Sequence, residues 1–222
     1  MATQEACRYL KKQSALNACK SLWLCIVLVV IISLSGNAAS PAAAAECTRC
    51  LVPEQARDII AMTASRAVQA LKSRDMNELS KLVHPVKAVR FSPYAFLDVK
   101  ADVRFTAAMI RGALTDSKVR VWGRYDGSGK PIRLSFSEYY KRFVYDRDFA
   151  QASEIFYNST QESLGNTHDN SREEYPEAII VEFHVPGPAG QDDTGFRGLR
   201  LVFEQYRDAW YLVYIVHDEW TI

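Results

Sequence analysis

Three β-rich stretches near the C-terminus constrain the fold most strongly. Residues 178–185, 199–206 and 210–217 combine β-branched and aromatic side chains with a regular alternation of apolar and polar positions. Only a few residues around Asp208 separate the last two stretches, which is typical of a tight hairpin connection. We therefore expect the three stretches to form an antiparallel meander.

The alternation also predicts which side chains of the meander share a face. One strand should place Leu199, Leu201 and Phe203 together on one side. The last strand should place on one face Trp210, Leu212, Tyr214 and Val216, and on the other Val213 and Ile215. Because apolar residues then occur on both faces, we expect both sides of the sheet to be at least partly covered.

The chain before the meander begins with helical patterns. Pro53 opens a stretch in which apolar residues recur at the spacing of one helix face over residues 60–71. Asp75 is placed to cap a second, shorter helix from Met76 to about Val83, and Thr106 is placed to start a third. A helical hairpin is therefore expected to lead the domain.

The middle of the chain predicts a β-hairpin followed by a helix. Residues 118–125 have the alternation of a strand, residues 126–129 read Asp-Gly-Ser-Gly, and residues 131–134 can form the return strand. Ser135 and Glu138 have the spacing of a capping box, which marks the start of a helix.

Residues 1–45 have the composition of a secretory signal peptide. A basic stretch precedes an apolar run from Leu22 to Leu34, and Ala43-Ala44-Ala45 stands just before Glu46. The run is shorter than the roughly 20 residues that a membrane-spanning helix needs. We expect cleavage after Ala45 and export to the periplasm, cell envelope or extracellular space. An uncleaved signal anchor is the alternative, and membrane contact is expected only in that case.

Cleavage would leave two of the five cysteines, Cys47 and Cys50, in a short Cys-x-x-Cys leader of residues 46–52. Because exported proteins meet an oxidising environment, a local disulfide is the preferred interpretation. Inert thiols, a redox pair, half of a metal site and pairing between chains remain alternatives. A single domain of residues 53–222 should follow this leader.

The charge of the expected mature chain argues against two classes of partner. The complete chain has 27 Lys and Arg against 26 Asp and Glu, and residues 1–45 contain four of the basic residues and one of the acidic ones. The remainder therefore has a net charge of −2. A nearly neutral chain without runs of like charge is not expected to bind nucleic acid or an anionic membrane surface.

Two pairs of residues could carry proton-transfer chemistry. Glu182 and His184 fall on the same face of one predicted strand, and His217 is followed directly by Asp218. A carboxylate beside an imidazole can hold its tautomer and raise its basicity. The competing interpretation of both pairs is that they are polar residues of a strand that meets water.

The order of the predicted elements resembles that of the NTF2-like (SnoaL-like) α+β cone fold over about residues 53–222. Four short segments also look like an uncharacterised group of exported bacterial proteins: His84-Pro85 and residues 90–94, 125–129 and 216–220. The resemblance implies N-terminal helices packed on a curved antiparallel sheet around an apolar pocket. It implies no particular activity, because this fold hosts both enzymes and binding modules.

We therefore expect an exported, non-catalytic module that binds a small apolar ligand or an envelope protein through its pocket or a sheet face. Tyr139, Tyr140 and Trp210 are the candidate ligand-binding residues. A homodimer is compatible with this hypothesis, and no cofactor or metal is expected.

The alternative is an isomerase- or dehydratase-like pocket enzyme. In it, His217 or His184 would act as the base, and Asp218 or Glu182 would orient that histidine.

Overall fold

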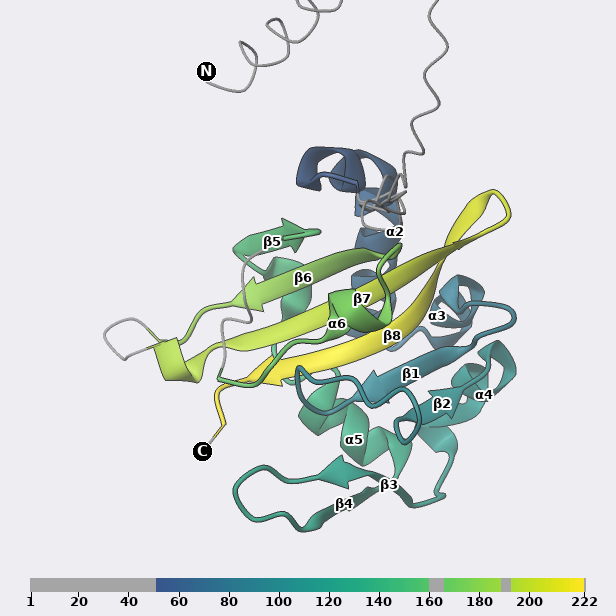
Figure 1. Ribbon diagram of the computed structural model, residues 1–222. Coiled ribbons are helices and arrows are strands. Elements are labelled where there is room, and N and C mark those ends of the chain that lie inside the picture. The colour runs from purple at the N-terminus through teal and green to yellow at the C-terminus, as the bar shows by residue number, and fades with distance from the viewer. Residues whose placement is uncertain (1–50, 160–165, 189–192, 222) are drawn as a thin grey trace, which may run out of the picture. The chain divides into compact units, whose positions relative to one another are not determined.

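The computed structural model describes residues 51–159, 166–188 and 193–221 of the chain (Figure 1). These residues form an α+β structure in which N-terminal helices pack against a six-stranded, mostly antiparallel sheet. The predicted fold class is confirmed.

Two helices begin the described structure, as the sequence predicted. Helix α2 (Pro53–Ser73) buries its apolar face, and the left-handed backbone of Arg74, with φ of 56°, ends it. Helix α3 (Met76–Leu82) follows at once, and the carboxylate of Asp75 accepts a 2.9 Å hydrogen bond from the amide of Glu78. The cap explains why the chain turns and restarts a helix within two residues.

Three shorter helices follow along the chain: α4 (Ala107–Gly112), α5 (Phe136–Phe143) and α6 (Ser171–Glu174). The predicted caps of the first two are confirmed. The Thr106 hydroxyl accepts from the amide of Met109, and Ser135 and Glu138 form a complete capping box. Single 3₁₀ turns occur at Ala113–Thr115, Phe149–Gln151 and Asp193–Gly195.

The main sheet has the order β2-β1-β8-β7-β6-β5. Its strands are β1 (Val89–Ser92), β2 (Val103–Phe105), β5 (Glu154–Tyr157), β6 (Ile179–Val185), β7 (Arg197–Tyr206) and β8 (Ala209–Glu219). Only β1 and β8 pair in parallel, while every other neighbouring pair is antiparallel. The predicted meander is β6-β7-β8, and β3 (Arg120–Arg124) and β4 (Pro131–Leu134) form a separate hairpin.

A β-bulge at Val213 corrects the prediction of faces along β8. Val202 pairs with Tyr214 and Phe203 pairs with Leu212, so Val213 has no partner in the β7–β8 register. The extra residue inverts the alternation. The predicted shared face is therefore wrong beyond this point: Leu212 lies in the main core, while Tyr214 belongs to a second cluster on the other side.

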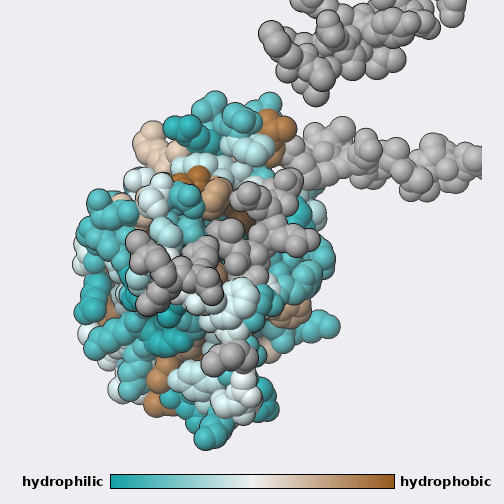
Figure 2. Space-filling view, turned by 90° about the vertical axis from the view of Figure 1, so that its left-hand side faces the viewer, coloured by the Kyte–Doolittle hydropathy of each residue, from teal (hydrophilic) through white to brown (hydrophobic). Residues whose placement is uncertain are grey.

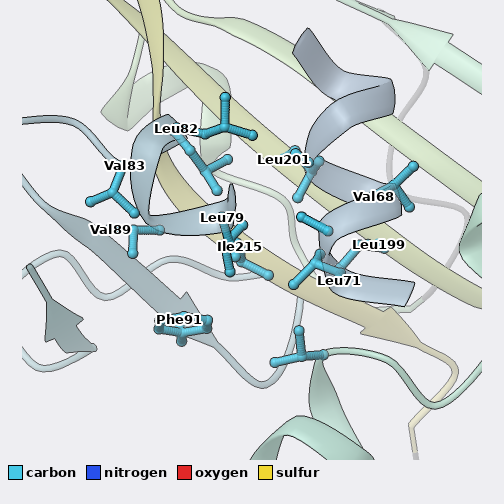
Figure 3. Packing of buried hydrophobic residues seen from close by; sticks show 14 of the residues in the cluster. Val68, Leu71, Leu79, Leu82, Val83, Val89, Phe91, Leu199, Leu201 and Ile215 are labelled. Atoms are coloured by element: carbon cyan, nitrogen blue, oxygen red, sulfur yellow. The ribbon is translucent and has the colours of Figure 1, made fainter. Parts of the chain in front are cut away.

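The main core fills the space between the helices and one face of the sheet. Figure 3 shows side chains of α2 and α3 against those of β1, β7 and β8: Val68, Leu71, Leu79, Leu82, Val89, Phe91, Leu199, Leu201 and Ile215. All of them are buried, which is the dominant favourable contribution to folding. The second cluster, with Leu97, Val202 and Val216, covers the opposite face beside Tyr175 and α6. Both faces of the sheet are covered, as expected.

The face seen in Figure 2 is mainly hydrophilic, and its hydrophobic residues stand in small separate groups. Within the described part of the chain, no helix combines the length and apolar character needed to cross a membrane.

Candidate functional site

An open cleft of about 500 Å³ lies between the β3–β4 hairpin and the segment that follows β1. Residues 92–94 form one wall, and residues 122–127 of the hairpin form the other. Two of the segments that carry the sequence resemblance, 90–94 and 125–129, therefore meet at one place. The sequence had marked both segments but had given neither a role.

Glycines allow the two walls to come together. Gly123 has φ of 128°, and a Cβ atom there would lie 3.4 Å from Cγ of Pro93. Gly127 and Gly129, with φ of 71° and 62°, turn the hairpin. The hydroxyl of Tyr94 then accepts a 3.3 Å hydrogen bond from the amide of Asp126, which connects the walls.

Stacked aromatic rings form the base of the cleft. The indole of Trp122 is buried, donates to the carbonyl of Leu134 at 2.9 Å, and stacks on Tyr139 with ring centroids 3.9 Å apart. The Tyr139 hydroxyl is fully buried and has no hydrogen-bond partner within the described residues. Burial raises the pKa of Tyr139 well above its usual value, and the nearby Asp102 carboxylate adds to this effect. A buried polar atom without a partner is uncommon in native proteins.

Asp102 supplies a titratable group to the cleft. Its Oδ2 atom accepts a 2.6 Å hydrogen bond from the Tyr214 hydroxyl and a 3.0 Å bond from the amide of Asp98. Burial raises the pKa of Asp102 from 3.8 to about 6, because the two hydrogen bonds only partly compensate for the lost water. The Tyr214 pKa is raised as well, by burial and by the Asp102 carboxylate.

The structure does not bring His217 and Asp218 together. His217 is buried on the main-core side of β8, where its Nε2 atom lies 3.2 Å from Oδ2 of Asp146. Asp146 also accepts a 3.0 Å bond from Nε of Arg197. Burial alone would raise the pKa of Asp146, but its interactions with His217 and Arg197 outweigh burial and hold it below the usual value.

Asp218 belongs instead to an ion-pair cluster around Arg200, which is itself 1% exposed. Its guanidinium lies 2.9 Å from Glu182, 3.1 Å from Asp169 and 3.4 Å from Asp218. These contacts keep Arg200 charged: burial alone would lower its pKa, but the three carboxylates raise it. The cluster connects Asp169, in the segment before α6, to strands β6, β7 and β8.

His184 lies near the Arg200 cluster but is not paired with Glu182. Its imidazole is buried, lies 4.0 Å from the Glu154 carboxylate and stacks on the ring of Phe196. Among the described residues, neither His184 nor His217 lines the cleft or the two further hollows beside β2 and β5.

The predicted ligand residues are spread over the fold. Tyr139 lies beneath the cleft, in contact with Trp122. Tyr140 is buried and its hydroxyl donates to the carbonyl of Leu71. Trp210 packs against the main core beside the β7–β8 turn, where it pairs with Gln205. Cys47 and Cys50, with the predicted disulfide, lie outside the described residues.

Sequence reasoning missed Asp102 as a candidate. Its main partner, Tyr214, lies 112 residues further along the chain, so no local spacing connects them. Within the described residues, no three His, Cys, Asp or Glu side chains are grouped to hold a metal ion.

Comparison with family models, curated proteins and solved structures gives no match for this chain. The architecture itself defines the class, an α+β protein with N-terminal helices on a six-stranded, mostly antiparallel sheet.

Proposed function

We propose that the protein is an exported, non-catalytic binding module with an NTF2-like fold, and that the cleft beside the β3–β4 hairpin binds a small ligand. The observation that carries this proposal is the convergence of Tyr94, Trp122 and Tyr125 with the half-buried carboxylate of Asp102 in a cleft of about 500 Å³. Mostly apolar clefts with a few placed polar groups are the usual ligand sites of proteins.

The surroundings of the two predicted catalytic histidines also favour binding over catalysis. His217 is enclosed between Asp146 and the ring of Phe143, and His184 lies between Glu154 and Phe196. A general base must reach the proton that it removes from a substrate. Both imidazoles are 2% exposed or less and neither lines the proposed cleft, so a structural role fits them better.

One observation favours the alternative of a proton-transfer enzyme. A carboxyl with a pKa of about 6, such as Asp102, holds and releases a proton near neutral pH. In that case Asp102 would act on a ligand in the cleft in place of the predicted histidines.

A fluorescent probe tests the proposed binding site. N-phenyl-1-naphthylamine is uncharged and apolar, and its emission rises when it leaves water. It should bind the purified wild-type protein and bind more weakly after Phe96→Ala or Tyr125→Ala, which remove rings from the cleft.

Ile155→Ala is the matched control, because Ile155 is 42% exposed, similar to the 49% of Phe96, but lines a different hollow on β5. The proposal is contradicted if the wild type does not bind the probe, or if Ile155→Ala weakens binding as much as the cleft variants.

A further inference from the structure

We propose that the cleft binds a small organic ammonium ion, with Asp102 as its counter-ion and the aromatic rings of the cleft against its apolar part. This inference rests on the proposed function, since it specifies the chemistry of a ligand for the same cleft.

The first argument is that the Asp102 carboxylate has no cationic partner. Its Oδ2 atom accepts from two uncharged donors, the Tyr214 hydroxyl and the Asp98 amide. Among the described residues, no hydrogen bond or ion pair reaches its Oδ1 atom. The nearest arginine, Arg90, donates to the backbone carbonyl of Asp102 at 3.0 Å and not to the carboxylate.

Four other buried or half-buried carboxylates among the described residues each lie within ion-pair distance of an arginine: Asp146, Glu182, Asp218 and Glu219. Removing a carboxylate from water is costly unless a positive charge compensates. For Asp102, two hydrogen bonds from uncharged donors and the more distant charge of Arg90 offset only part of this cost, which is expected of a group that receives its counter-ion from a ligand.

The second argument is the aromatic lining. Tyr94, Phe96, Tyr125 and Trp122 contribute rings to the same cleft as Asp102. The faces of aromatic rings attract cations, and a nearby carboxylate adds a charge-assisted hydrogen bond to an ammonium group. Aromatic rings together with a carboxylate that lacks a cationic partner therefore favour a ligand that is both apolar and positively charged.

The other charged groups of the cleft are consistent with a cation. Asp126 adds a second carboxylate. Arg124 adds one positive charge, but its guanidinium donates to the Gly129 carbonyl at 2.9 Å and so is held against the hairpin turn. The charged side chains that line the cleft therefore sum to a negative charge.

Binding should depend on pH through Asp102. Its pKa of about 6 means that the carboxylate is mostly ionised at pH 8 and mostly protonated at pH 5, while an alkylammonium stays protonated throughout. The groups that face Asp102 from neighbouring segments are Asp98, Arg90, Tyr139, Tyr175 and Tyr214. The pKa values of the three tyrosines are all raised from 10, so they stay neutral between pH 5 and pH 8.

Calorimetric titration with benzylammonium and with benzyl alcohol tests the inference, because the two probes have nearly the same shape and differ in charge. At pH 8 the wild-type protein should bind benzylammonium at least about tenfold more tightly than benzyl alcohol, from the ion pair and the cation–π contact together. Lowering the pH to 5 should weaken benzylammonium binding about tenfold and leave benzyl alcohol unchanged.

Asp102→Asn should lose most of the preference for the cation and keep only what the aromatic rings contribute. Asp208→Asn removes an exposed carboxylate at the β7–β8 turn, outside the cleft, and should keep the full preference. Equal binding of the two probes by the wild type, or a wild-type cation preference in Asp102→Asn, would overturn the inference. Neither result affects the proposed function, which fails only if the naphthylamine probe does not bind at the cleft. The pH series uses the wild type alone and is independent of how the variants fold.

Discussion

Replacing Asp102 by asparagine should stabilise the protein at pH 8 but not at pH 4. The amide oxygen of asparagine can accept the same hydrogen bonds from the Tyr214 hydroxyl and the Asp98 amide that Oδ2 accepts now. The substitution therefore keeps the local contacts and removes only the ionisation of the carboxyl.

The magnitude follows from the pKa of Asp102, which folding raises from 3.8 to about 6. The folded state holds the proton more tightly than the unfolded state, so this group favours folding most below pH 3.8. That contribution is lost as the pH rises to 6. At about 1.4 kcal/mol per pKa unit, the loss amounts to about 3 kcal/mol. Asparagine does not titrate, so the advantage of the variant over the wild type should grow by up to this amount between pH 4 and pH 8.

Urea unfolding of both proteins at pH 4 and pH 8, followed by circular dichroism, measures this difference. Asp126→Asn serves as the control, since it removes an exposed carboxylate from the same cleft and should change stability similarly at both pH values. If the stability difference between Asp102→Asn and the wild type is the same at pH 4 and pH 8, the reasoning about Asp102 is refuted. A variant that gains stability while losing benzylammonium binding would identify a carboxylate retained for binding.

Three further results are expected. The Nδ1 atom of His84 accepts hydrogen bonds from the amides of Val86 and Lys87, and burial lowers the pKa of this imidazole below 6.5. The stability that the neutral ring supplies should therefore be lost as the pH falls below 6.5, and an NMR titration that gives His84 a pKa above 6.5 would contradict this. Arg200→Met should lower the free energy of unfolding by about 3–5 kcal/mol, because it leaves carboxylates buried without their cation; a loss near zero in urea unfolding would contradict that role. Mass spectrometry of the exported protein should find Glu46 as its first residue, whereas an intact leader would support the signal anchor.

Local signals were sufficient to predict most of the secondary structure. The helix at Pro53, the cap at Asp75 and the capping box at Ser135 each depend on residues within a few positions of one another, and all three are confirmed. The meander was predictable for the same reason, since its strands have regular alternation and short connections.

The faces of β8 and the cleft were not predictable in this way. The bulge at Val213 depends on how β8 pairs with β7, and no sequence signal near Val213 predicts it. The separation of His217 from Asp218 could have been anticipated, since consecutive strand residues point to opposite faces. The contact between Asp102 and Tyr214 could not, because it joins residues 112 positions apart.

NMR mapping of the bound N-phenyl-1-naphthylamine tests the proposed binding cleft most directly. The amide signals of Gly123, Gly127 and Gly129 report on one wall of the cleft, and those of Ile155 and Tyr157 report on a separate hollow beside β5. We predict that saturating probe shifts the three glycine signals and leaves the β5 signals in place. Shifts confined to β5, or no shifts at all, would contradict the proposal that this cleft is where the protein binds its ligand.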